Sequence, residues 1–381
     1  MLERIHLENF KSNRNVDVRL TPLTVLTGMN GSGKSTLLQS IGLLRQSYDA
    51  NGNTSGLSLG GDLAQLGQRS DVLSEGAESD ALTFTIWEDR KDYRWISRGL
   101  PEANLLRFEE PLPNIPKFLT TPDFQFLQAN RILPQTLYPQ APQQARDKGF
   151  LGARGEFTAD FLAMSVRSGK TSVRKARRCP KIGIGLDKPL LQKVSPVDDA
   201  LLDQVAGWLQ QLSPGVRIAA ELVSGTDEVL LKFEYVGQHR DVKSSPYRPT
   251  NVGFGLTYSL PILVACLAAR PGALLLIENP EAHLHPQGQA ALGELLARCA
   301  GDGVQIIAET HSDHLLNGVR LAVKKKLLKT GDVTIHFFSR SVEDGEVAVQ
   351  SPVVDQNGKL SEWPVGFFDQ WDRSLEELLD D

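Results

Sequence analysis

The chain has 381 residues, of which 41% are hydrophobic and 23% charged, and its formal net charge is −5. This composition is typical of a soluble globular protein with room for two domains, or for one large α/β domain with an insertion. The mild negative charge argues against binding nucleic acid by overall charge, and no apolar run approaches the roughly 20 residues of a membrane span, so we expect a cytoplasmic protein without a membrane partner.

The N-terminal segment predicts strands that lead into a glycine-rich loop. Apolar and polar residues alternate over 5–7 and again over 16–20, as in half-buried strands. The short apolar run 23–27 then predicts a buried strand, and 36–44 predict a helix. The loop between this strand and this helix is therefore flanked as a nucleotide-binding loop requires.

That loop, residues 28–35, reads G-M-N-G-S-G-K-S, a complete G-x-x-x-x-G-K-[ST] phosphate loop. Its glycines allow successive backbone N–H groups to point at phosphate oxygens, at the N-terminus of a helix. Lys34 adds a charge for the β- and γ-phosphates, and the Ser35 hydroxyl is suited to ligate Mg²⁺. The alternative is a chance glycine-rich loop. We expect ATP and Mg²⁺ as cofactors, held by Asn30, Gly31, Ser32, Gly33, Lys34, Ser35 and Thr36.

The middle of the chain carries weaker signals. Residues 82–87 and 93–96 predict an antiparallel hairpin with a polar turn between them. Apolar residues at helical spacing from 197 to 212 predict an amphipathic helix, and 216–220 with 229–233 predict a second strand pair. The three cysteines are far apart, and Cys266 and Cys299 lie in apolar helical surroundings, so we expect buried thiols and neither disulfides nor zinc ligands.

The last third alternates strands with helices, which indicates a largely parallel sheet. The predicted strands are 273–277, 304–308 and 333–338, and the predicted helices are 255–269, 287–300 and 314–328. The first of these helices contains Pro261, where we expect a kink.

Acidic residues follow the first strand of this third, where a phosphate loop needs a partner to hold Mg²⁺ and steer water. Glu278 is the candidate for binding Mg²⁺, and Glu281 is the candidate for orienting or deprotonating the attacking water. The alternative is that these acids only cap the next helix. His311, after the next strand, could reach a γ-phosphate and sense its loss. His283 and His285 are expected to belong to a turn and not to a zinc site.

A basic segment and an aromatic cluster are candidate partner surfaces. Residues 167–181 are rich in lysine and arginine and could follow the backbone of DNA or RNA, but without interleaved aromatic residues they could equally form a solvated loop. Aromatic residues gather in the tail at Trp363, Phe367, Phe368 and Trp371. Packing of the tail on the core is the default expectation, and docking of a second protein is the alternative.

These motifs together resemble the SMC/RecF-like branch of the ABC-type ATPases. Residues 7–12 are similar to that branch's N-terminal strand and turn, and 251–257 to its diverged signature motif. Residues 278–281 are similar to its Walker B segment, and 310–312 to its switch-histidine loop. The resemblance implies an ABC-type P-loop ATPase with a largely parallel sheet, an antiparallel β element and an inserted α/β lobe.

The phrases 278–286, 309–314 and 363–369 further resemble small bacterial AAA-type ATPases akin to the overcoming-lysogenisation-defect (OLD) proteins, in particular those with an uncharacterised C-terminal domain. The resemblance implies a head-to-tail homodimer on ATP binding, in which Gly253, Gly255 and Thr257 of one subunit contact the nucleotide held by the other. By the same resemblance Lys11 could approach the nucleotide. Gln128 is a weak candidate for the Q-loop, and the nearby Arg131 could pair with phosphate or form a structural ion pair.

Two departures from the family pattern bear on activity. Walker B segments of ABC-type ATPases usually end in Asp-Glu, but this chain has Glu278-Asn279, so Glu281 or Glu278 must replace the catalytic base or hydrolysis is slow. No D-x-D cluster follows residue 340, so a cutting activity would come from a partner.

From these features we predict four parts. They are an N-terminal part of the ATPase domain (1–100), an inserted lobe (101–248), a C-terminal part of the ATPase domain (249–340) and a tail domain (341–381). The predicted function is ATP hydrolysis that switches a dimer acting on nucleic acid or gating an effector, in anti-phage defence or DNA repair. The alternative is a slowly hydrolysing scaffold that controls a separate nuclease or toxin. A small-molecule kinase is the third, less favoured interpretation.

Overall fold

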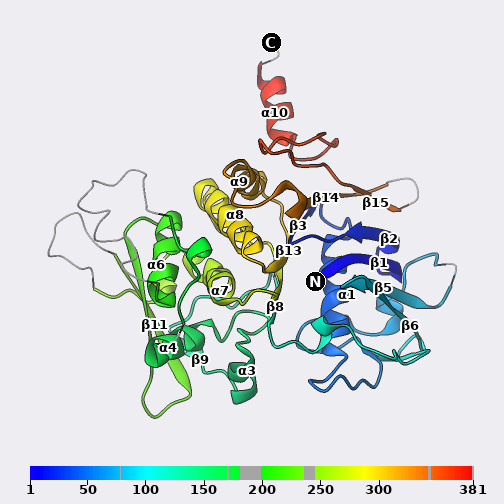
Figure 1. Ribbon diagram of the computed structural model, residues 1–381, viewed down its shortest axis with the longest axis horizontal. Helices are drawn as coiled ribbons and strands as arrows, with labels where there is room; N and C mark the ends of the chain where they lie inside the picture. The colour runs from blue at the N-terminus through cyan, green and yellow to red at the C-terminus, as the bar shows by residue number, and fades with distance from the viewer. Residues whose placement is uncertain (78, 170, 181–198, 236–244, 342–344, 380–381) are drawn as a thin grey trace. The chain divides into compact units, whose positions relative to one another are not determined.

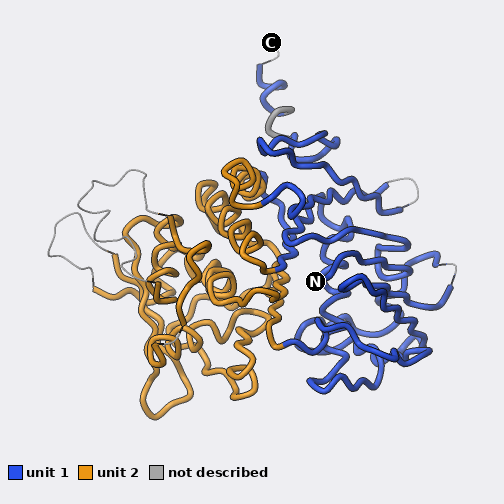
Figure 2. Tube along the Cα trace, viewed as in Figure 1, with its two compact units in different colours: residues 1–121, 305–313, 329–381 blue, residues 122–304, 314–328 orange. Residues whose placement is uncertain are grey.

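A computed structural model describes residues 1–77, 79–169, 171–180, 199–235, 245–341 and 345–379, without the side chains of 370–373 (Figure 1). Lys170, Lys181 and the start of the helix predicted from 197 lie outside the described residues. The chain forms two compact units (Figure 2). Unit 1 comprises residues 1–121, 305–313 and 329–381, and unit 2 comprises 122–304 and 314–328. The four-part division expected from the sequence stays a prediction.

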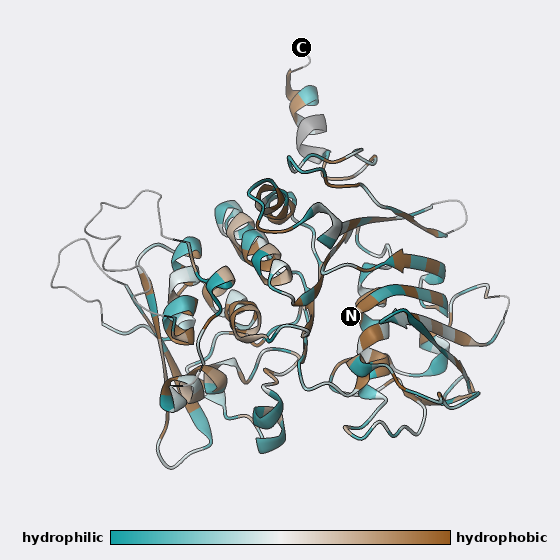
Figure 3. Ribbon diagram, viewed as in Figure 1, coloured by the Kyte–Doolittle hydropathy of each residue, from teal (hydrophilic) through white to brown (hydrophobic). Residues whose placement is uncertain are grey.

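Unit 1 contains an antiparallel sheet with the strand order β2-β1-β5-β6-β7-β4. Its strands are β1 (Leu2–Phe10), β2 (Asn13–Arg19), β4 (Leu57–Ser58), β5 (Leu82–Glu88), β6 (Lys91–Arg98) and β7 (Leu105–Phe108). Hydrophobic and hydrophilic residues alternate along β1 and β2 (Figure 3), and Ile5, Leu7, Val16 and Val18 are buried. The alternation places one side of the sheet on the core, as the sequence predicted.

The predicted hairpin exists, but its turn is shorter than expected. β5 and β6 pair up to Glu88 and Lys91, which leaves Asp89 and Arg90 as the turn. Both turn residues have positive φ, 52° and 64°. Two-residue turns with positive φ match the twist of paired strands, so the strands continue into the segment predicted as a loop.

Unit 1 also contains the strands that carry the phosphate loop. β3 (Leu23–Gly28) pairs in parallel with β13 (Gln305–Glu309) on one side and with β14 (Val333–Arg340) on the other. β15 (Val347–Gln350) pairs antiparallel with β14. Helix α1 (Lys34–Gln46) packs on β3 and β13. The remaining elements of unit 1 are α2 (Arg69–Val72), the 3-10 turns η1 (Lys117–Leu119) and η4 (Thr330–Asp332), and α10 (Gln370–Leu379).

In the tail of unit 1, the aromatic side chain of Phe367 packs on this sheet. Phe367 is 1% exposed, and its ring lies 5.4 Å from that of Phe337 on β14. Trp363 lies 5.3 Å from Phe367 but remains 54% exposed. Packing on the core, the default expectation, is therefore confirmed for Phe367.

Unit 2 joins a parallel strand pair, a small antiparallel sheet and a group of helices. β12 (Leu274–Glu278) pairs in parallel with β8 (Phe124–Leu127). The sheet has the order β10-β11-β9, formed by Val216–Leu222, Glu228–Tyr235 and Leu137–Pro139. The helices and turns are α3 (Gln143–Lys148), α4 (Thr158–Ser168), η2 (Lys175–Arg177), α6 (Leu201–Leu212), η3 (Pro249–Asn251), α7 (Phe254–Ala268), α8 (Pro286–Gly301) and α9 (Asp313–Lys324), whose first residue belongs to unit 1.

The helices of unit 2 differ in detail from the prediction. α7 runs through Pro261 and is buried along most of its length. α9 ends at Lys324, four residues before the predicted end at Leu328, and the left-handed backbone of Lys326 (φ 59°) excludes further helix. α3 and α4 occupy a segment to which the sequence analysis assigned no element.

Two other expectations from composition can be compared with the structure. Cys266 and Cys299 are fully buried free thiols, as predicted, and Cys179 is half-buried. Among the described residues, none of the helices is long and apolar enough to cross a membrane.

Candidate functional site

The phosphate loop connects β3 to α1 with a backbone that favours glycine. Gly31 and Gly33 have positive φ angles of 76° and 97°. A Cβ atom on Gly33 would lie 2.2 Å from Asn13 Oδ1, whereas a Cβ atom on Gly31 would meet open space. α1 starts at Lys34 with no acidic residue in its first turn and no side-chain cap. Its N-terminal N–H groups therefore suit an anionic ligand.

Lys34 lies inside the loop that precedes it. Its side chain is 2% exposed, and its ammonium donates to the carbonyls of Gly28 at 3.0 Å and Met29 at 2.7 Å. Loop carbonyls thus hold the ammonium at the N-terminus of α1, where a phosphate would approach the helix. Ser35, the next residue, is half-buried.

Glu309 is a site residue that the sequence analysis missed. It ends β13, directly beside β3, and its side chain is 6% exposed. The Ser35 hydroxyl donates to Glu309 Oε1 at 2.9 Å, and Lys34 Nζ lies 3.9 Å from the same oxygen. The available signal was an acid at the carboxyl end of the strand next to the phosphate loop, but recognising it required the strand order.

These groups fit Mg²⁺ and a nucleotide. A hydroxyl and a carboxylate supply the hard oxygen atoms that Mg²⁺ prefers. Ser35, predicted as a metal ligand, offers such an oxygen at the start of α1, and the Glu309 carboxylate lies next to it. Mg²⁺ bound to phosphate oxygens would neutralise charge that develops during phosphoryl transfer.

His311 and Lys11 both belong to unit 1. His311 follows β13, and its Nε2 lies 4.0 Å from Glu309 Oε1 with a side chain 35% exposed. The structure therefore brings His311 together with Lys34, Ser35 and Glu309. Lys11 has a left-handed backbone (φ 55°), and its ammonium donates to Gln39 Oε1 of α1 at 2.8 Å. The nucleotide contact expected of Lys11 stays a prediction.

In unit 2, Glu278 lies at the carboxyl end of β12, as predicted. Its Oε2 accepts a hydrogen bond from the backbone N–H of Ala129 at 2.9 Å. Gln128 directly follows β8, whose Leu127 pairs with Ile277 of β12, so Gln128 and Glu278 leave adjacent strands at the same level. This position suits the Q-loop assignment, which remains a proposal. Glu281 lies three residues beyond Glu278 and is half-buried.

Arg131 fastens the turn that contains these acids. It is 1% exposed, and it donates to the carbonyls of Glu278 at 2.8 Å and Asn279 at 2.5 Å. Its guanidinium also lies 5.2 Å from the ring centre of Tyr258. Burial lowers the pKa of Arg131 to about 10, against the opposing effect of Tyr258, Glu281 and Glu278. These contacts give Arg131 the structural role that the sequence analysis left open.

The signature-like segment forms the start of α7, where Gly253 is exposed and Thr257 is 3% exposed. A Cβ atom on Gly255 would lie 2.5 Å from the carbonyl oxygen of His283, so the helix can touch the turn after β12 only because residue 255 lacks a side chain. His283 also packs on two rings of α7, 5.6 Å from Phe254 and 4.8 Å from Tyr258. Aromatic packing thus accounts for this histidine, as the turn interpretation expected, and within unit 2 the start of α7 and the turn after β12 form one packed cluster.

Three arginines of the basic segment form ion pairs. Arg174 and Arg177 both contact Asp302, at 2.6 and 2.8 Å, and Arg178 contacts Asp199 at 2.7 Å. Arg177 is fully buried and also donates to the carbonyls of Cys266 and Ala269. These contacts give the three arginines a structural role, which neither the nucleic-acid nor the solvated-loop interpretation of the segment expected. Arg167 and Lys175 are exposed.

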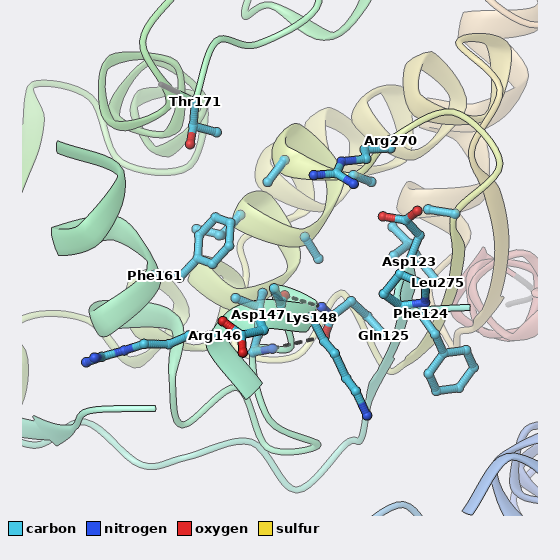
Figure 4. A pocket seen from close by; sticks show the side chains of 18 residues that line it. Asp123, Phe124, Gln125, Arg146, Asp147, Lys148, Phe161, Thr171, Arg270 and Leu275 are labelled. Atoms are coloured by element: carbon cyan, nitrogen blue, oxygen red, sulfur yellow. Dashed lines mark hydrogen bonds between the residues drawn. The ribbon is translucent and has the colours of Figure 1, made fainter. Parts of the chain in front are cut away.

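A cavity of about 300 Å³ in unit 2 lies at the amino ends of β8 and β12 (Figure 4), whereas Glu278 and Glu281 lie at and after the carboxyl end of β12. Asp123, Phe124, Val264, Ala268 and Leu275 contribute to its lining. Part of its polar wall already has protein partners: the side chain of Gln125 bonds Gly149 and Leu151, and that of Arg146 bonds Asp160. The cavity is therefore a poor candidate for the nucleotide site.

Comparisons with known proteins identify the family and the fold of this chain. Residues 23–317 match the family described as "AAA domain, putative AbiEii toxin, Type IV TA system", and residues 328–378 match a protein family of unknown function, DUF3696. A 44-residue segment is 43% identical to the OLD nuclease of Thermus scotoductus. That segment covers 12% of this chain and 8% of the nuclease.

Two solved structures share the fold. One is the SmcHead bound to the C-winged helix domain of ScpA, with a TM-score of 0.52 and 15% identity over 93% of this chain and 98% of that chain. The other is the Smc head domain with an extended coiled coil bound to the C-terminal domain of ScpA, from Pyrococcus furiosus, with a TM-score of 0.50 and 15% identity over 100% and 99%. The resemblance read from the motifs is thus confirmed: the fold is similar to that of SMC head domains, and the chain belongs to the AAA-domain family that its residues 23–317 match.

Proposed function

We propose that the protein binds and hydrolyses ATP with Mg²⁺ and uses the cycle as a switch. The contact of Ser35 with Glu309, beside Lys34 and His311 in a glycine-dependent loop, carries the proposal. Lys34 and residues 30–36 grip the phosphates, Ser35 ligates the metal ion and His311 senses the γ-phosphate. Glu278 adds a carboxylate to the metal, and Glu281 orients or deprotonates the attacking water.

The switch is a head-to-tail homodimer formed on ATP binding, in which Gly253, Gly255 and Thr257 complete the partner's nucleotide site. The packing of Gly255 and Tyr258 on His283 supports this proposal, because a phosphate bound at the start of α7 would bear directly on the turn after Glu278. The γ-phosphate would then supply contacts that exist only in the closed dimer. Closure and opening would act on nucleic acid or gate an effector such as a nuclease or toxin, in anti-phage defence or DNA repair.

A slowly hydrolysing scaffold is the second candidate, and Asn279 favours it. Asn279 follows the first acid after β12, and a neutral amide cannot take a proton from water as a carboxylate can. In this case ATP binding would control the dimer and hydrolysis would only reset it.

Measurements of phosphate release and sedimentation, with and without ATP and duplex DNA, test the proposal. We expect ATP-dependent dimers in the wild type and neither dimers nor turnover in Lys34→Ala. Lys91→Ala, which removes an exposed lysine of β6, should behave as the wild type. Normal turnover by Lys34→Ala would refute the site. Fast, DNA-stimulated turnover would support the motor, and dimers with negligible turnover would support the scaffold.

The roles of Glu278 and Glu281 need separate variants. Glu278→Gln should weaken Mg²⁺-dependent nucleotide binding, whereas Glu281→Gln should retain binding and lose turnover. Full turnover in Glu281→Gln would show that another group orients or deprotonates the attacking water. DNA binding should be tested with Arg167→Ala and Lys175→Ala, because these side chains are exposed and Arg177 is buried in an ion pair.

A further inference from the structure

Glu309 reaches the phosphate loop through the order of the strands in unit 1. β13 lies parallel to β3, with Glu309 opposite Leu26, and the N–H of Thr310 donates to the carbonyl of Leu26 at 2.9 Å. Since both strands run in the same direction, Glu309 leaves the sheet at the edge where the phosphate loop begins. The backbone thus places this carboxylate beside α1.

Three functional groups converge on one oxygen of this carboxylate. Glu309 Oε1 lies 2.9 Å from Ser35 Oγ, 3.9 Å from Lys34 Nζ and 4.0 Å from His311 Nε2. The side chain is 6% exposed. Burying a carboxylate is costly unless charged or hydrogen-bonding groups surround it, so this position is set by those groups.

The direction of the hydrogen bond between Ser35 and Glu309 matters for metal binding. A serine hydroxyl has one proton and two lone pairs. An ionised carboxylate can only accept, so the Ser35 proton points at Glu309 and both lone pairs of Ser35 Oγ face elsewhere. Hydroxyl oxygen oriented in this way is ready to ligate a cation, and partners behind a ligand raise its affinity for metal.

We propose that Glu309 is a positioning residue of the metal site: it orients the Ser35 hydroxyl toward Mg²⁺ and places a negative charge behind that ligand. The inference rests on the proposed nucleotide site and adds a residue to it. The competing explanation is that Glu309 only balances the charge of Lys34. The two explanations differ in whether the effect of Glu309 on nucleotide binding depends on the metal ion.

The test measures the dissociation constant of a fluorescent ATP derivative once with Mg²⁺ and once with EDTA. The ratio compared between variants is the constant in EDTA divided by the constant with Mg²⁺. Glu309→Gln keeps the shape of the side chain and removes its charge. We expect the ratio to fall by about 10–100-fold, as for other groups that orient metal ligands, while the affinity in EDTA stays equal or becomes tighter. A Glu309→Gln variant with the wild-type ratio would overturn the proposal. This includes the case in which both dissociation constants change by the same factor.

A second variant shows whether Glu309 acts through Ser35. In a Ser35→Ala background, Glu309→Gln should change the ratio by less than about 2-fold, because the group that it orients is already gone. The full effect of Glu309→Gln in that background would contradict the proposed route. Glu309→Asp keeps the charge and shortens the side chain, so its ratio should stay closer to that of the wild type than the ratio of Glu309→Gln. This variant replaces Glu309→Gln in the test if Glu309→Gln does not fold.

Two controls separate the possible failures. Glu8→Gln removes the same charge from a half-buried strand position paired with Arg94, and it should leave the ratio unchanged. If the wild type binds no ATP derivative, the proposed function fails and this inference fails with it. If the wild type binds with a clear preference for Mg²⁺ and Glu309→Gln keeps that preference, only the role of Glu309 is refuted.

Discussion

Arg131 donates to the main-chain carbonyl of Asn279, a residue whose backbone is left-handed with φ 43°. A non-glycine residue in this conformation costs free energy and persists only where its surroundings hold it. Arg131 also binds the carbonyl of Glu278, so its guanidinium spans both sides of the strained residue. The direction in which the chain leaves Glu278 toward Glu281 therefore depends on one buried cation.

Arg131→Met should destabilise the protein by roughly 2–4 kcal/mol, because it leaves buried carbonyls without a donor. The measurement is the free energy of unfolding in urea. Arg154→Met, at an exposed arginine, should change it by no more than about 0.5 kcal/mol. Similar values for the two variants would show that the turn does not depend on Arg131.

Gly33→Ala should abolish nucleotide binding, and Gly31→Ala should weaken it much less. Both positions have positive φ, so both variants incur the same kind of backbone strain, about 1 kcal/mol. Only at Gly33 would the new methyl group also collide with Asn13, a side chain that is fully buried. Equilibrium binding of ATP with Mg²⁺ checks this pair, and equal losses would argue against the described loop.

Arg177→Met should lower the free energy of unfolding by about 3–5 kcal/mol, because it breaks a buried ion pair. Its removal leaves Asp302 with the exposed Arg174 alone. Lys175→Met, at the neighbouring exposed side chain, should change stability by no more than about 0.5 kcal/mol. If Arg177→Met folds with full stability and loses only DNA binding, the basic segment is a nucleic-acid surface after all.

His336 should make the protein less stable in mild acid. Burial lowers its pKa from the usual 6.5, against the opposing hydrogen bond to the Arg19 carbonyl. The unfolded chain therefore binds a proton at a pH where the folded chain does not, so this contribution is complete above about pH 6.5 and is lost as the pH falls below it. Urea unfolding between pH 7.5 and 5 should show a steeper loss for wild type than for His336→Gln, and parallel curves would contradict the assignment.

Local motifs made much of this fold predictable. The phosphate loop needs only its own spacing and its flanking strand and helix, and Glu278 needs only the end of an apolar strand, so both could be read from the sequence. Glu309 could not, because its role comes from β13 lying next to β3, which no local pattern states. For the same reason Arg177 was read as part of a basic surface, although its guanidinium donates to carbonyls that are 89 and more residues away in the chain.

The elements between residues 100 and 170 were missed for a different reason. α3 has only six residues and none of them is buried, and β9 has three residues. Such short elements show no period, and packing rather than propensity decides their structure. α4 is longer, but its buried residues 158–160, 162 and 163 include a threonine and an aspartate, which weakens the hydrophobic pattern.

The contact of Ser35 with Glu309 joins positions 274 residues apart, and β13 belongs to a nine-residue segment of unit 1, residues 305–313, that lies in the chain between two stretches of unit 2. A growing chain that carries the whole phosphate loop must therefore wait for most of unit 2 to be synthesised before β3 gains its neighbour. A fragment ending before residue 305 would contain G-M-N-G-S-G-K-S and still lack the strand that supports it. The proposed nucleotide site is thus assembled late in biosynthesis, although its phosphate-loop motif is among the first residues made.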